Sequence, residues 1–233
     1  GAAAGEGPTA PGPAQVAGPP PVIVTCQDIR EVYQASRLTP NTLVKARDTA
    51  EVGKIFGLGV SGFLGSVIEL EAVAFPARQP GKGTLRFNET AGSMAKDSVF
   101  NAASVFRRLT GKELSDYDVH VNVVGGGRID GPSAGTAVLL AVYSAVEGRP
   151  LRQDVAVTGE LSIQGRVRAV GGVYEKIYGA KQAGVRKVLI PEENRQEVPP
   201  NLRGIEVVPV STVDEALGHV LAEPPAEPVA RTA

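Results

Sequence analysis

A strand pattern, a glycine-rich turn and an apolar helix pattern follow one another in the middle of the chain. Val119–Val123 alternates apolar and polar residues, which is typical of a strand with one buried face. Gly125–Gly127 predicts a turn. The apolar run Thr136–Val146 then predicts a buried helix that ends at Gly148. Such a chain must pack a helix against a sheet immediately after a tight turn.

The start of this helix contains a serine in a setting that suits chemistry. Pro132 fits the first turn, where its missing N–H would have had no partner. Ser133 follows it, near the free backbone N–H groups and the positive end of the helix dipole, which favour negative charge. The small residues Gly131, Ala134 and Gly135 let another chain approach closely. An acyl-transfer enzyme needs such a place for a serine alkoxide and an oxyanion. The alternative is that Pro132 and Ser133 simply begin a buried helix.

The composition restricts the possible classes of function. With 233 residues, 42% of them hydrophobic, the chain can bury a full core. Its formal net charge of −1 and its lack of a dense lysine and arginine block predict no nucleic-acid or membrane partner. The single cysteine, Cys26, excludes an internal disulfide and fits a reducing, cytoplasmic setting. No apolar run of spanning length and no signal-peptide pattern occurs, so we expect a soluble protein.

The ends of the chain differ in composition from the rest. The N-terminal end is low-complexity Gly, Ala and Pro, and the C-terminal end is rich in Pro, Glu and Ala, so we expect both to be disordered. Thr25 and Asp28 form a capping-box pattern that predicts a short helix to about Arg37. We therefore divide the chain into a linker, a helix with a charged connector, a main domain and a tail, at residues 1–21, 22–50, 51–221 and 222–233.

The main domain is predicted to mix strands and helices without strict alternation. The predicted strands are Lys54–Leu58, Val67–Phe75, Thr84–Phe87, Val119–Val123, Val155–Val157, Lys187–Pro191 and Ile205–Pro209, with a hairpin around Gln164-Gly165. The predicted helices, besides the one after Ser133, are Met94–Leu109, Val173–Gly184 and Val213–Leu221. Gly59–Gly65 is interpreted as a turn, and Glu69 and Glu71 as lying on a solvated strand face. This pattern favours an α+β fold with helices packed on a mixed β-sheet.

A serine nucleophile needs a proton acceptor, and the chain has only two histidines. His219 lies in the last predicted helix, where a solvated or capping role is the simpler interpretation. His120 lies on the strand that leads toward Ser133, but on the opposite strand face from Val119 and Val121. We interpret it as a half-buried strand residue.

A lysine offers another proton acceptor. At about 100° per residue, Lys176 falls within the apolar stripe of its predicted helix. That stripe consists of Val173, Ile177, Ala180 and Ala183. Burial disfavours the charged ammonium and lowers the pKa of a lysine, which then becomes a usable general base near neutral pH. The alternative is a lysine that extends out of an apolar face to water.

Two further motifs have both a chemical and a purely structural interpretation. Thr158-Gly159-Glu160 directly follows a predicted strand, and the Thr158 hydroxyl can orient an amine. The structural alternative is a threonine that only forms a turn. Gly171-Gly172, before the lysine helix, allows close backbone approach or merely makes a turn.

Taken together, the motifs resemble one family. They are Gly131-Pro132-Ser133-Ala134-Gly135, Thr158-Gly159-Glu160, Gly171-Gly172-Val173 with Glu175-Lys176-Ile177, and Ile190-Pro191 with Asn194. In order and spacing they resemble the proteolytic domain of the Lon proteases, from about Ile55 to Leu221. Phe87-Asn88-Glu89-Thr90 and Arg128-Ile129-Asp130 are most similar to the bacterial B-type Lon proteins.

The resemblance implies a Ser-Lys dyad on an α+β fold of the ribosomal protein S5 domain 2-like kind. Ser133 is then the nucleophile and Lys176 the general base, with Thr158 positioning the lysine. The backbone of Ser133 and Ala134 supplies the oxyanion site. Asp130 takes a supporting role, and structures of the family differ in whether it engages the dyad.

The resemblance also implies partners. Lon proteases are hexamers in which an ATPase ring unfolds substrates, so unfolded proteins, further copies of the chain and an ATPase module are expected partners. The nucleotide-binding pattern G-x-x-x-x-G-K-[ST] does not occur, because Gly53-Lys54, Gly81-Lys82 and Gly111-Lys112 are followed by Ile55, Gly83 and Glu113. We therefore expect no cofactor for this chain. ATP and Mg²⁺ are expected only for an ATPase module, and residues 22–50 resemble the helical end of such a module.

Two other classes of function remain as alternatives. Gly125–Ala137 is also similar to the Gly/Ser-rich phosphate loop of small-molecule kinases with a related α+β fold, and a helix N-terminus can bind phosphate. No second kinase motif accompanies it, and Lys176 would have no task. An inactive oligomerisation domain is the third possibility, against which the presence of both Ser133 and Lys176 argues.

Overall fold

A computed structural model describes residues 22–35, 46–87, 93–124 and 131–222. The chain divides into two units, Gly1–Asn41 and Thr42–Ala233. The first contains helix α1, Cys26–Ala35. Its predicted capping box is confirmed, because the Thr25 N–H donates to Asp28 Oδ2 over 2.7 Å and the Asp28 N–H donates to Thr25 Oγ1 over 3.3 Å.

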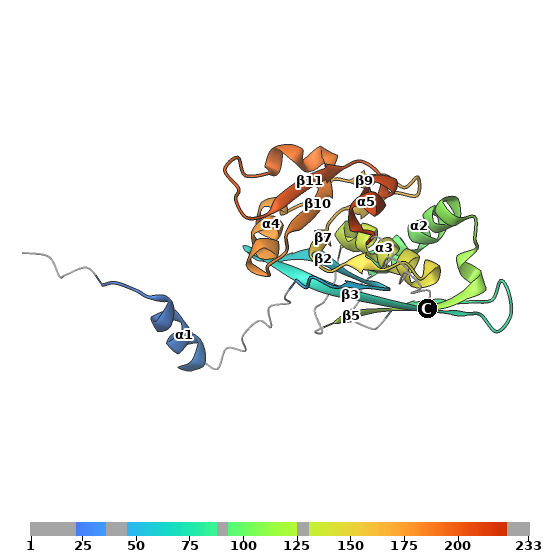
Figure 1. Ribbon diagram of the computed structural model, residues 1–233, viewed down its shortest axis with the longest axis horizontal. Coiled ribbons are helices and arrows are strands. Elements are labelled where there is room, and N and C mark those ends of the chain that lie inside the picture. Colours follow the sequence, from blue (N-terminus) through green and yellow to red (C-terminus); the bar gives the residue numbers. More distant parts are fainter. Residues whose placement is uncertain (1–21, 36–45, 88–92, 125–130, 223–233) are drawn as a thin grey trace, which may run out of the picture. The chain divides into compact units, whose positions relative to one another are not determined.

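A seven-stranded mixed sheet organises the second unit (Figure 1). Its order is β11-β10-β7-β2-β3-β5-β4. The strands are β2 Lys54–Ser61, β3 Leu64–Pro76, β4 Leu85–Phe87, β5 Tyr117–Val124, β7 Val155–Val157, β10 Lys187–Pro191 and β11 Glu206–Val210. The β2/β3 and β3/β5 pairs are antiparallel and the other pairs are parallel. The predicted α+β class with a mixed sheet is confirmed.

Two short ribbons flank the main sheet. β1 (Ala50–Glu51) pairs with β6 (Leu151–Arg152), and β8 (Glu160–Leu161) pairs with β9 (Val167–Arg168). The second ribbon confirms the predicted hairpin, in which Gly165 takes the positive φ of 78° that a tight turn requires.

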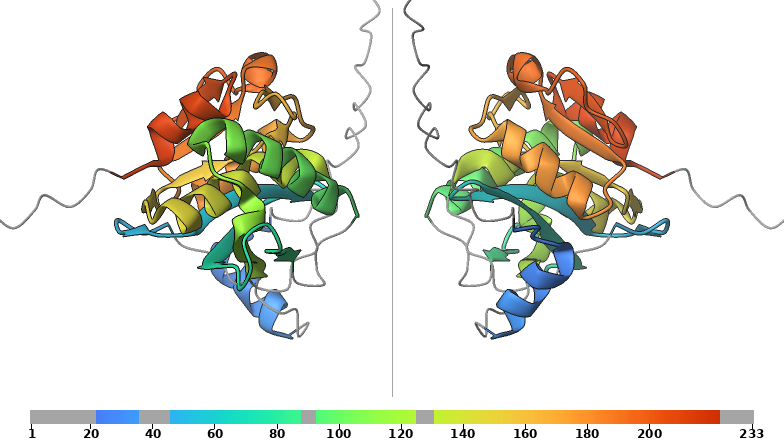
Figure 2. Two further views of the ribbon diagram at one scale, coloured as in Figure 1. Left: turned by 90° about the vertical axis from the view of Figure 1, so that its right-hand side faces the viewer. Right: turned by 90° about the vertical axis from the view of Figure 1, so that its left-hand side faces the viewer.

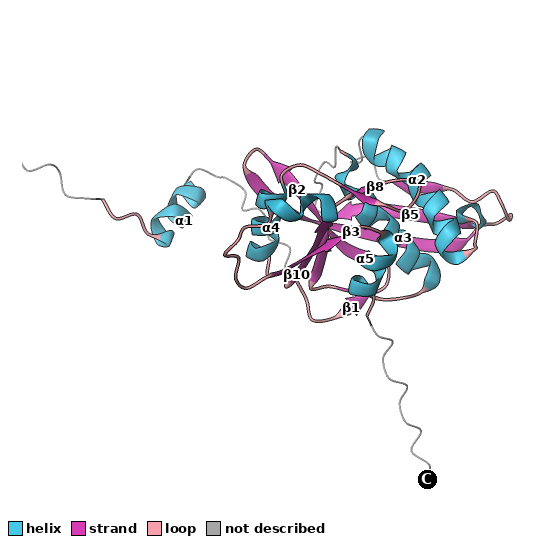
Figure 3. Cartoon of the chain, turned by 90° about the horizontal axis from the view of Figure 1, so that it is seen from above, coloured by secondary structure: helices cyan, strands magenta, loops and turns pink. Residues whose placement is uncertain are grey.

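The helices cover both faces of the sheet. They are α2 Ser93–Thr110, α3 Gly135–Glu147, α4 Val173–Gln182 and α5 Val213–Val220, with short 3₁₀ turns η1 Leu114–Asp116, η2 Pro132–Ala134 and η3 Glu192–Glu197. The side views show α2 (green) stacked above α3 (yellow-green) on the sheet (Figure 2). Helix α3 packs on β2, β3 and β5 with α2 against it, α5 contacts β11, and α4 contacts β3, β2 and β10 (Figure 3). As predicted, α3 ends at Gly148, a left-handed cap.

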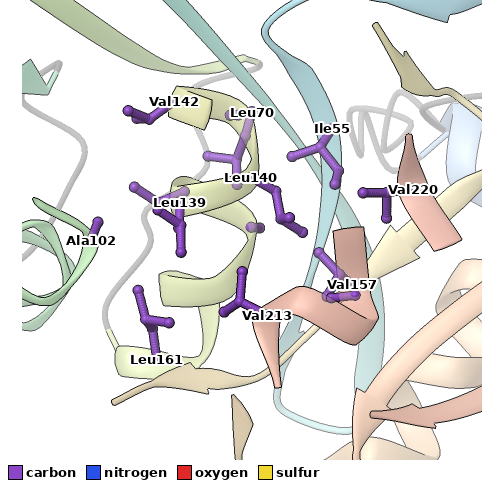
Figure 4. Packing of buried hydrophobic residues seen from close by; sticks show 14 of the residues in the cluster. Ile55, Leu70, Ala102, Leu139, Leu140, Val142, Val157, Leu161, Val213 and Val220 are labelled. Carbon is purple, nitrogen blue, oxygen red and sulfur yellow. The ribbon is translucent and has the colours of Figure 1, made fainter. Parts of the chain in front are cut away.

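Alternating residues of the central strands pack into two separate hydrophobic cores, one on each side of the sheet. Ile55, Leu70 and Val157 point to the core formed with α2, α3 and α5, where Leu139 and Leu140 are fully buried (Figure 4). The intervening residues Phe56, Leu58, Ala156, Val188 and Ile190 point to a second core, formed with α4. Because successive strand residues face opposite sides, the central strands β2, β7 and β10 contribute to a core on each side of the sheet, whereas one face of β5 is exposed.

The prediction of a turn over Gly59–Gly65 is wrong, because most of these residues belong to strands β2 and β3. β2 and β3 pair through Gly59 with Ser66, Val60 with Gly65 and Ser61 with Leu64, and the hairpin closes at Gly62. The glycines serve close packing instead. A Cβ on Gly65 would lie 1.8 Å from the Glu175 carbonyl oxygen, so only glycine allows α4 to rest on the strand.

The expectation of a solvated Glu69 is also wrong. Its carboxylate is buried beside the Lys54 ammonium, which also lies 3.6 Å from Glu51 and 3.7 Å from Glu71. The alternation in the sequence does place Glu69 and Glu71 opposite Leu70. The strand face that carries both residues is buried at Glu69. There the positive charge of Lys54 offsets the cost of burying the carboxylate.

The two histidines lie away from the buried core. His120 is exposed rather than half-buried, and it does face away from Val119 and Val121, which are buried. His219 is half-buried on α5. In the described part of the chain, we find no helix with the length and apolar character that crossing a membrane requires.

Candidate active site

Three of the predicted site residues meet at one end of β7. Ser133 lies in η2, the 3₁₀ turn that leads into α3. Thr158 immediately follows β7, and Lys176 lies on α4. The sheet topology brings these three segments together although they are far apart in the sequence. Asp130 lies outside the described residues, so its predicted supporting role stays a prediction.

Lys176 is buried, as the helix pattern predicted. Its side chain belongs to the face of α4 that carries Val173, Ile177 and Ala180, and only 3% of the residue is exposed. Its ammonium donates a hydrogen bond to Thr158 Oγ1 over 3.1 Å. Burial lowers the pKa of Lys176 to about 8, against which the negative charge of Glu197 acts to raise it. Roughly one Lys176 amine in ten is therefore neutral at pH 7.

Thr158 is fully buried and fixes the direction of its hydroxyl group. Its Oγ1 lies 3.5 Å from the Ser133 carbonyl oxygen and donates toward it. With the proton directed there, a lone pair of Oγ1 is free to accept from Lys176. The Thr158 N–H is in turn bound to the Leu189 carbonyl over 3.0 Å, which ties the hydroxyl to β10.

Hydrogen bonds in both directions join the Thr158-Gly159 segment to the turn that carries Ser133. The Gly159 N–H donates to the Ser133 carbonyl over 3.0 Å, and Thr136 donates to the Gly159 carbonyl through its N–H (3.2 Å) and its hydroxyl (2.9 Å). A Cβ on Gly159 would lie 2.4 Å from a Val167 methyl group, which explains the glycine. These bonds hold the serine turn and the threonine in one register.

Ser133 and Lys176 line the same cleft. Its volume is about 370 Å³, and its walls are formed by Val60, Pro132, Ser133, Ala169, Val170, Gly171 and Lys176. Ser133 is half-buried, so its hydroxyl is accessible from the cleft, whereas Lys176 contributes its buried amine. A serine hydroxyl and a buried amine with a lowered pKa that line one cleft are the groups that nucleophilic acyl transfer requires.

The wall formed by Ala169–Gly171 is held by residues of η3. Asn194 is buried, and its Oδ1 accepts from the Val170 N–H while its Nδ2 donates to the Val170 carbonyl, each over 3.0 Å. Glu193 accepts from the Ala169 N–H over 2.9 Å. Asn194 thus pairs with Val170 as a neighbouring strand would. The Asn194 position was noticed in the sequence, but no pattern there indicated this role.

The position of Val60 in the cleft was not predicted, because the glycines around it favour a turn there. One signal was present. Phe56, Leu58 and Val60 continue the alternation of apolar residues beyond the predicted end of the strand.

A family model described as the Lon protease (S16) C-terminal proteolytic domain matches residues 24–223. The chain belongs to the Lon protease family. Lon protease 2 of Bacillus subtilis is 40% identical over 219 residues, and the archaeal Lon protease of Pyrococcus abyssi is 39% identical over 217 residues. The Lon protease of Rickettsia bellii is 35% identical over 189 residues. The resemblance inferred from the motifs is confirmed.

The match covers most of this chain but a small part of these Lon proteases. It spans 88%, 86% and 76% of the chain, and 39%, 22% and 24% of the three relatives. The chain therefore corresponds to the proteolytic part of a Lon protease, and a peptidase function follows from that membership.

Proposed function

We propose that the chain is a serine-type endopeptidase domain that hydrolyses peptide bonds of unfolded polypeptides with a Ser133-Lys176 dyad. The observation that carries this proposal is the desolvated Lys176 amine, oriented by Thr158 in the cleft that Ser133 lines. The α+β fold of the ribosomal protein S5 domain 2-like kind belongs to the same proposal.

The first half of the reaction forms an ester. The neutral Lys176 amine accepts the proton of the Ser133 hydroxyl as its oxygen attacks the scissile carbonyl carbon. The backbone N–H groups of Ser133 and Ala134 stabilise the oxyanion, because the first N–H groups of a helical turn have no acceptor within the helix. Lys176 then gives its proton to the departing amine, and the C–N bond breaks.

The second half regenerates the enzyme. The Lys176 amine, neutral again, accepts a proton from water as the water oxygen attacks the ester carbonyl. The bond to Ser133 Oγ breaks, and the lysine returns the proton to the serine. Thr158 accepts a hydrogen bond from Lys176 throughout, so the amine keeps its position when its charge changes.

The end of β2 fits an extended substrate. β7 pairs with β2 only at Phe56 and Gly57 in the described residues, and β2 continues past the last of these pairs to Val60, which lines the cleft. A polypeptide that adds to this edge as a strand presents a peptide bond to the cleft whatever its side chains. Backbone recognition of this kind suits unfolded substrates, because a folded chain hides its strand edges.

The whole-protein aspects of the proposal rest on family membership. We propose that the domain works in a homo-oligomer, a hexamer, in the cytoplasm. An ATPase module of the same protein, which binds ATP and Mg²⁺, unfolds substrates for it. The isolated chain then cleaves short or unfolded peptides slowly without nucleotide and leaves folded proteins intact.

The test is cleavage of a fluorogenic peptide, with and without ATP, by the wild type and by Ser133→Ala. We expect slow cleavage that ATP does not change and that Ser133→Ala abolishes. The double variant Ser133→Ala/Lys176→Met should be little worse than either single variant, because residues that act as one unit are not additive. ATP hydrolysis by the purified chain, or cleavage by a folded Ser133→Ala protein, would contradict the proposal.

A further inference from the structure

An apolar groove lies beside the cleft, between the tip of the β2–β3 hairpin and α4. Its volume is about 300 Å³. Its large apolar residues are Phe63 and Leu64 from the hairpin and Tyr174 and Tyr178 from the helix, and Glu175 and Gln182 of the helix also line it. Phe63 is 93% exposed and Leu64 71% exposed. Large apolar side chains at a hairpin tip have no packing role in the fold, and such exposure marks an interaction site.

The two tyrosines form the far wall of the groove. Tyr174 and Tyr178 are one helical turn apart on α4, and their ring centroids are 4.8 Å apart. Both are more than a third exposed. Aromatic rings with polar ends offer contact area at little entropic cost while their hydroxyl groups stay in water.

The groove and the catalytic cleft are built by the same two elements. Val60, which lines the cleft, is the cross-strand partner of Gly65, which lines the groove. Figure 1 shows the hairpin reaching α4. On this helix Lys176 is buried, whereas Tyr174 and Tyr178 are exposed. At the helix start, a Cβ on Gly172 would lie 2.7 Å from a Val60 methyl group, so the hairpin is packed firmly there.

We propose that this groove holds an apolar segment of the unfolded substrate, outside the residues bound in the cleft. This inference rests on the proposed function. A chain lying along Val60 reaches the groove within a few residues, since the hairpin leads from one to the other. Unfolded chains expose the aromatic and aliphatic side chains that folded proteins bury, so the groove selects for them.

The size of the groove favours a substrate segment over a second copy of the chain. Eight residues line it, whereas a stable interface between proteins involves roughly 20–30 residues on each side. A weak, reversible contact suits a substrate that must move on after each cleavage.

The first experiment measures binding. A 20-residue peptide labelled with fluorescein carries leucine and phenylalanine on both sides of a four-residue cleavage sequence, and a second peptide has serine at those positions. The binding of each peptide is measured by fluorescence anisotropy with two proteins. One is the inactive Ser133→Ala variant, and the other is the triple variant Ser133→Ala/Phe63→Ser/Leu64→Ser. We expect the hairpin changes to weaken binding of the apolar peptide about tenfold and of the serine peptide hardly at all. The matched control is Phe75→Ser, which removes an exposed aromatic residue, 58% accessible, from the other end of β3.

The second experiment measures cleavage of the four-residue fluorogenic peptide alone. We expect its kcat/KM to stay within about twofold in Phe63→Ser/Leu64→Ser with Ser133 intact, because this peptide occupies only the cleft. Equal binding of the apolar peptide by both proteins overturns the groove proposal. A smaller species for the hairpin variant in sedimentation overturns it in favour of an interface between copies. If the wild type does not cleave the short peptide, the proposed function fails, and the binding comparison still decides the groove.

Discussion

Lys54 and Lys176 are both buried lysines next to the central strands, yet their surroundings give them opposite properties. Lys54 is 7% exposed and Lys176 3% exposed. Burial lowers the pKa of each amine. For Lys54, the hydrogen bond and charge of Glu69, with the charge of Glu51, outweigh burial and raise the pKa above its ordinary value. For Lys176, burial prevails and the pKa is about 8.

The difference lies in the partner and in the depth of burial, since the Lys176 amine is the more deeply desolvated of the two. Lys54 has a carboxylate in contact and two more within 4 Å, whereas Lys176 donates to the neutral hydroxyl of Thr158. A carboxylate stabilises the ammonium, and a hydroxyl orients the amine without holding its proton. One lysine is therefore a structural cation and the other a candidate base.

The largest expected effect is on cleavage by Lys176→Met. The variant loses the proton acceptor, so kcat should fall about 10²–10⁴-fold. The fold should persist, because a thioether suits an apolar site and the costly buried ammonium is removed. Peptide cleavage beside circular dichroism and thermal melting measures both. Lys181→Met, an exposed change on the same helix, is the control, and near-normal cleavage by folded Lys176→Met would rule out the dyad.

The same substitution at Lys54 should instead affect stability. Lys54→Met leaves the buried Glu69 carboxylate without its cation and should lower the free energy of unfolding by about 3 kcal/mol. Cleavage below the melting transition should be retained. Urea unfolding measures the loss, and Lys54→Met/Glu69→Leu should recover most of it. Lys112→Met, which breaks an exposed pair with Glu147, should cost much less, because water screens the pair. An equal loss of unfolding free energy in Lys54→Met and Lys176→Met would contradict the contrast between these two lysines.

The pH dependence of cleavage should follow Lys176. Because the neutral amine is the active form, kcat/KM should rise with pH and level off above the pKa of about 8. Lys176→Arg should show no activity at any pH, since a guanidinium stays protonated. A rate profile of the wild type between pH 6 and 9.5 is the measurement. A profile that is already flat at about pH 7 would show that another group is the base.

The two lysines should also affect stability with opposite signs. The folded pKa of Lys176 lies below its unfolded value of 10.5, so the unfolded chain binds more protons between about pH 8 and 10.5, and stability rises with pH in that window. Lys176→Met should lack this rise. The folded pKa of Lys54 lies above 10.5, so its contribution is fully present below 10.5 and is lost as pH rises through the folded value. Melting curves of the wild type and each variant separate the two.

The smallest expected effect concerns Glu197. Its charge raises the pKa of Lys176, so Glu197→Gln should lower that pKa further and move the midpoint of the rate profile to lower pH. The plateau rate should change little. Glu192→Gln, a change in the same 3₁₀ turn whose carboxylate pairs with Arg195, serves as the control. A shift of the midpoint to higher pH would contradict the assignment.

Local patterns in the sequence predicted the elements of the fold well, but not their lengths where packing decides. The helix stripe around Lys176 predicted its burial, because a 3.6-residue period defines a face before any neighbour is known. The β2–β3 hairpin was predicted too short, because glycine usually marks a turn. Here Gly65 provides the close approach to α4, a neighbour more than a hundred residues away in the sequence.

The sequence by itself determined the family, the order of elements and the face of α4 on which Lys176 lies. These depend on residue identity, spacing and period, which are local. Tertiary structure alone decided that Thr158 also contacts the Ser133 turn, that Asn194 holds the Val170 wall, and that Glu69 is buried with Lys54. Each of these depends on which segments the sheet topology brings together. The partner that a buried charge receives there, and not the residue type, sets its protonation and therefore its role.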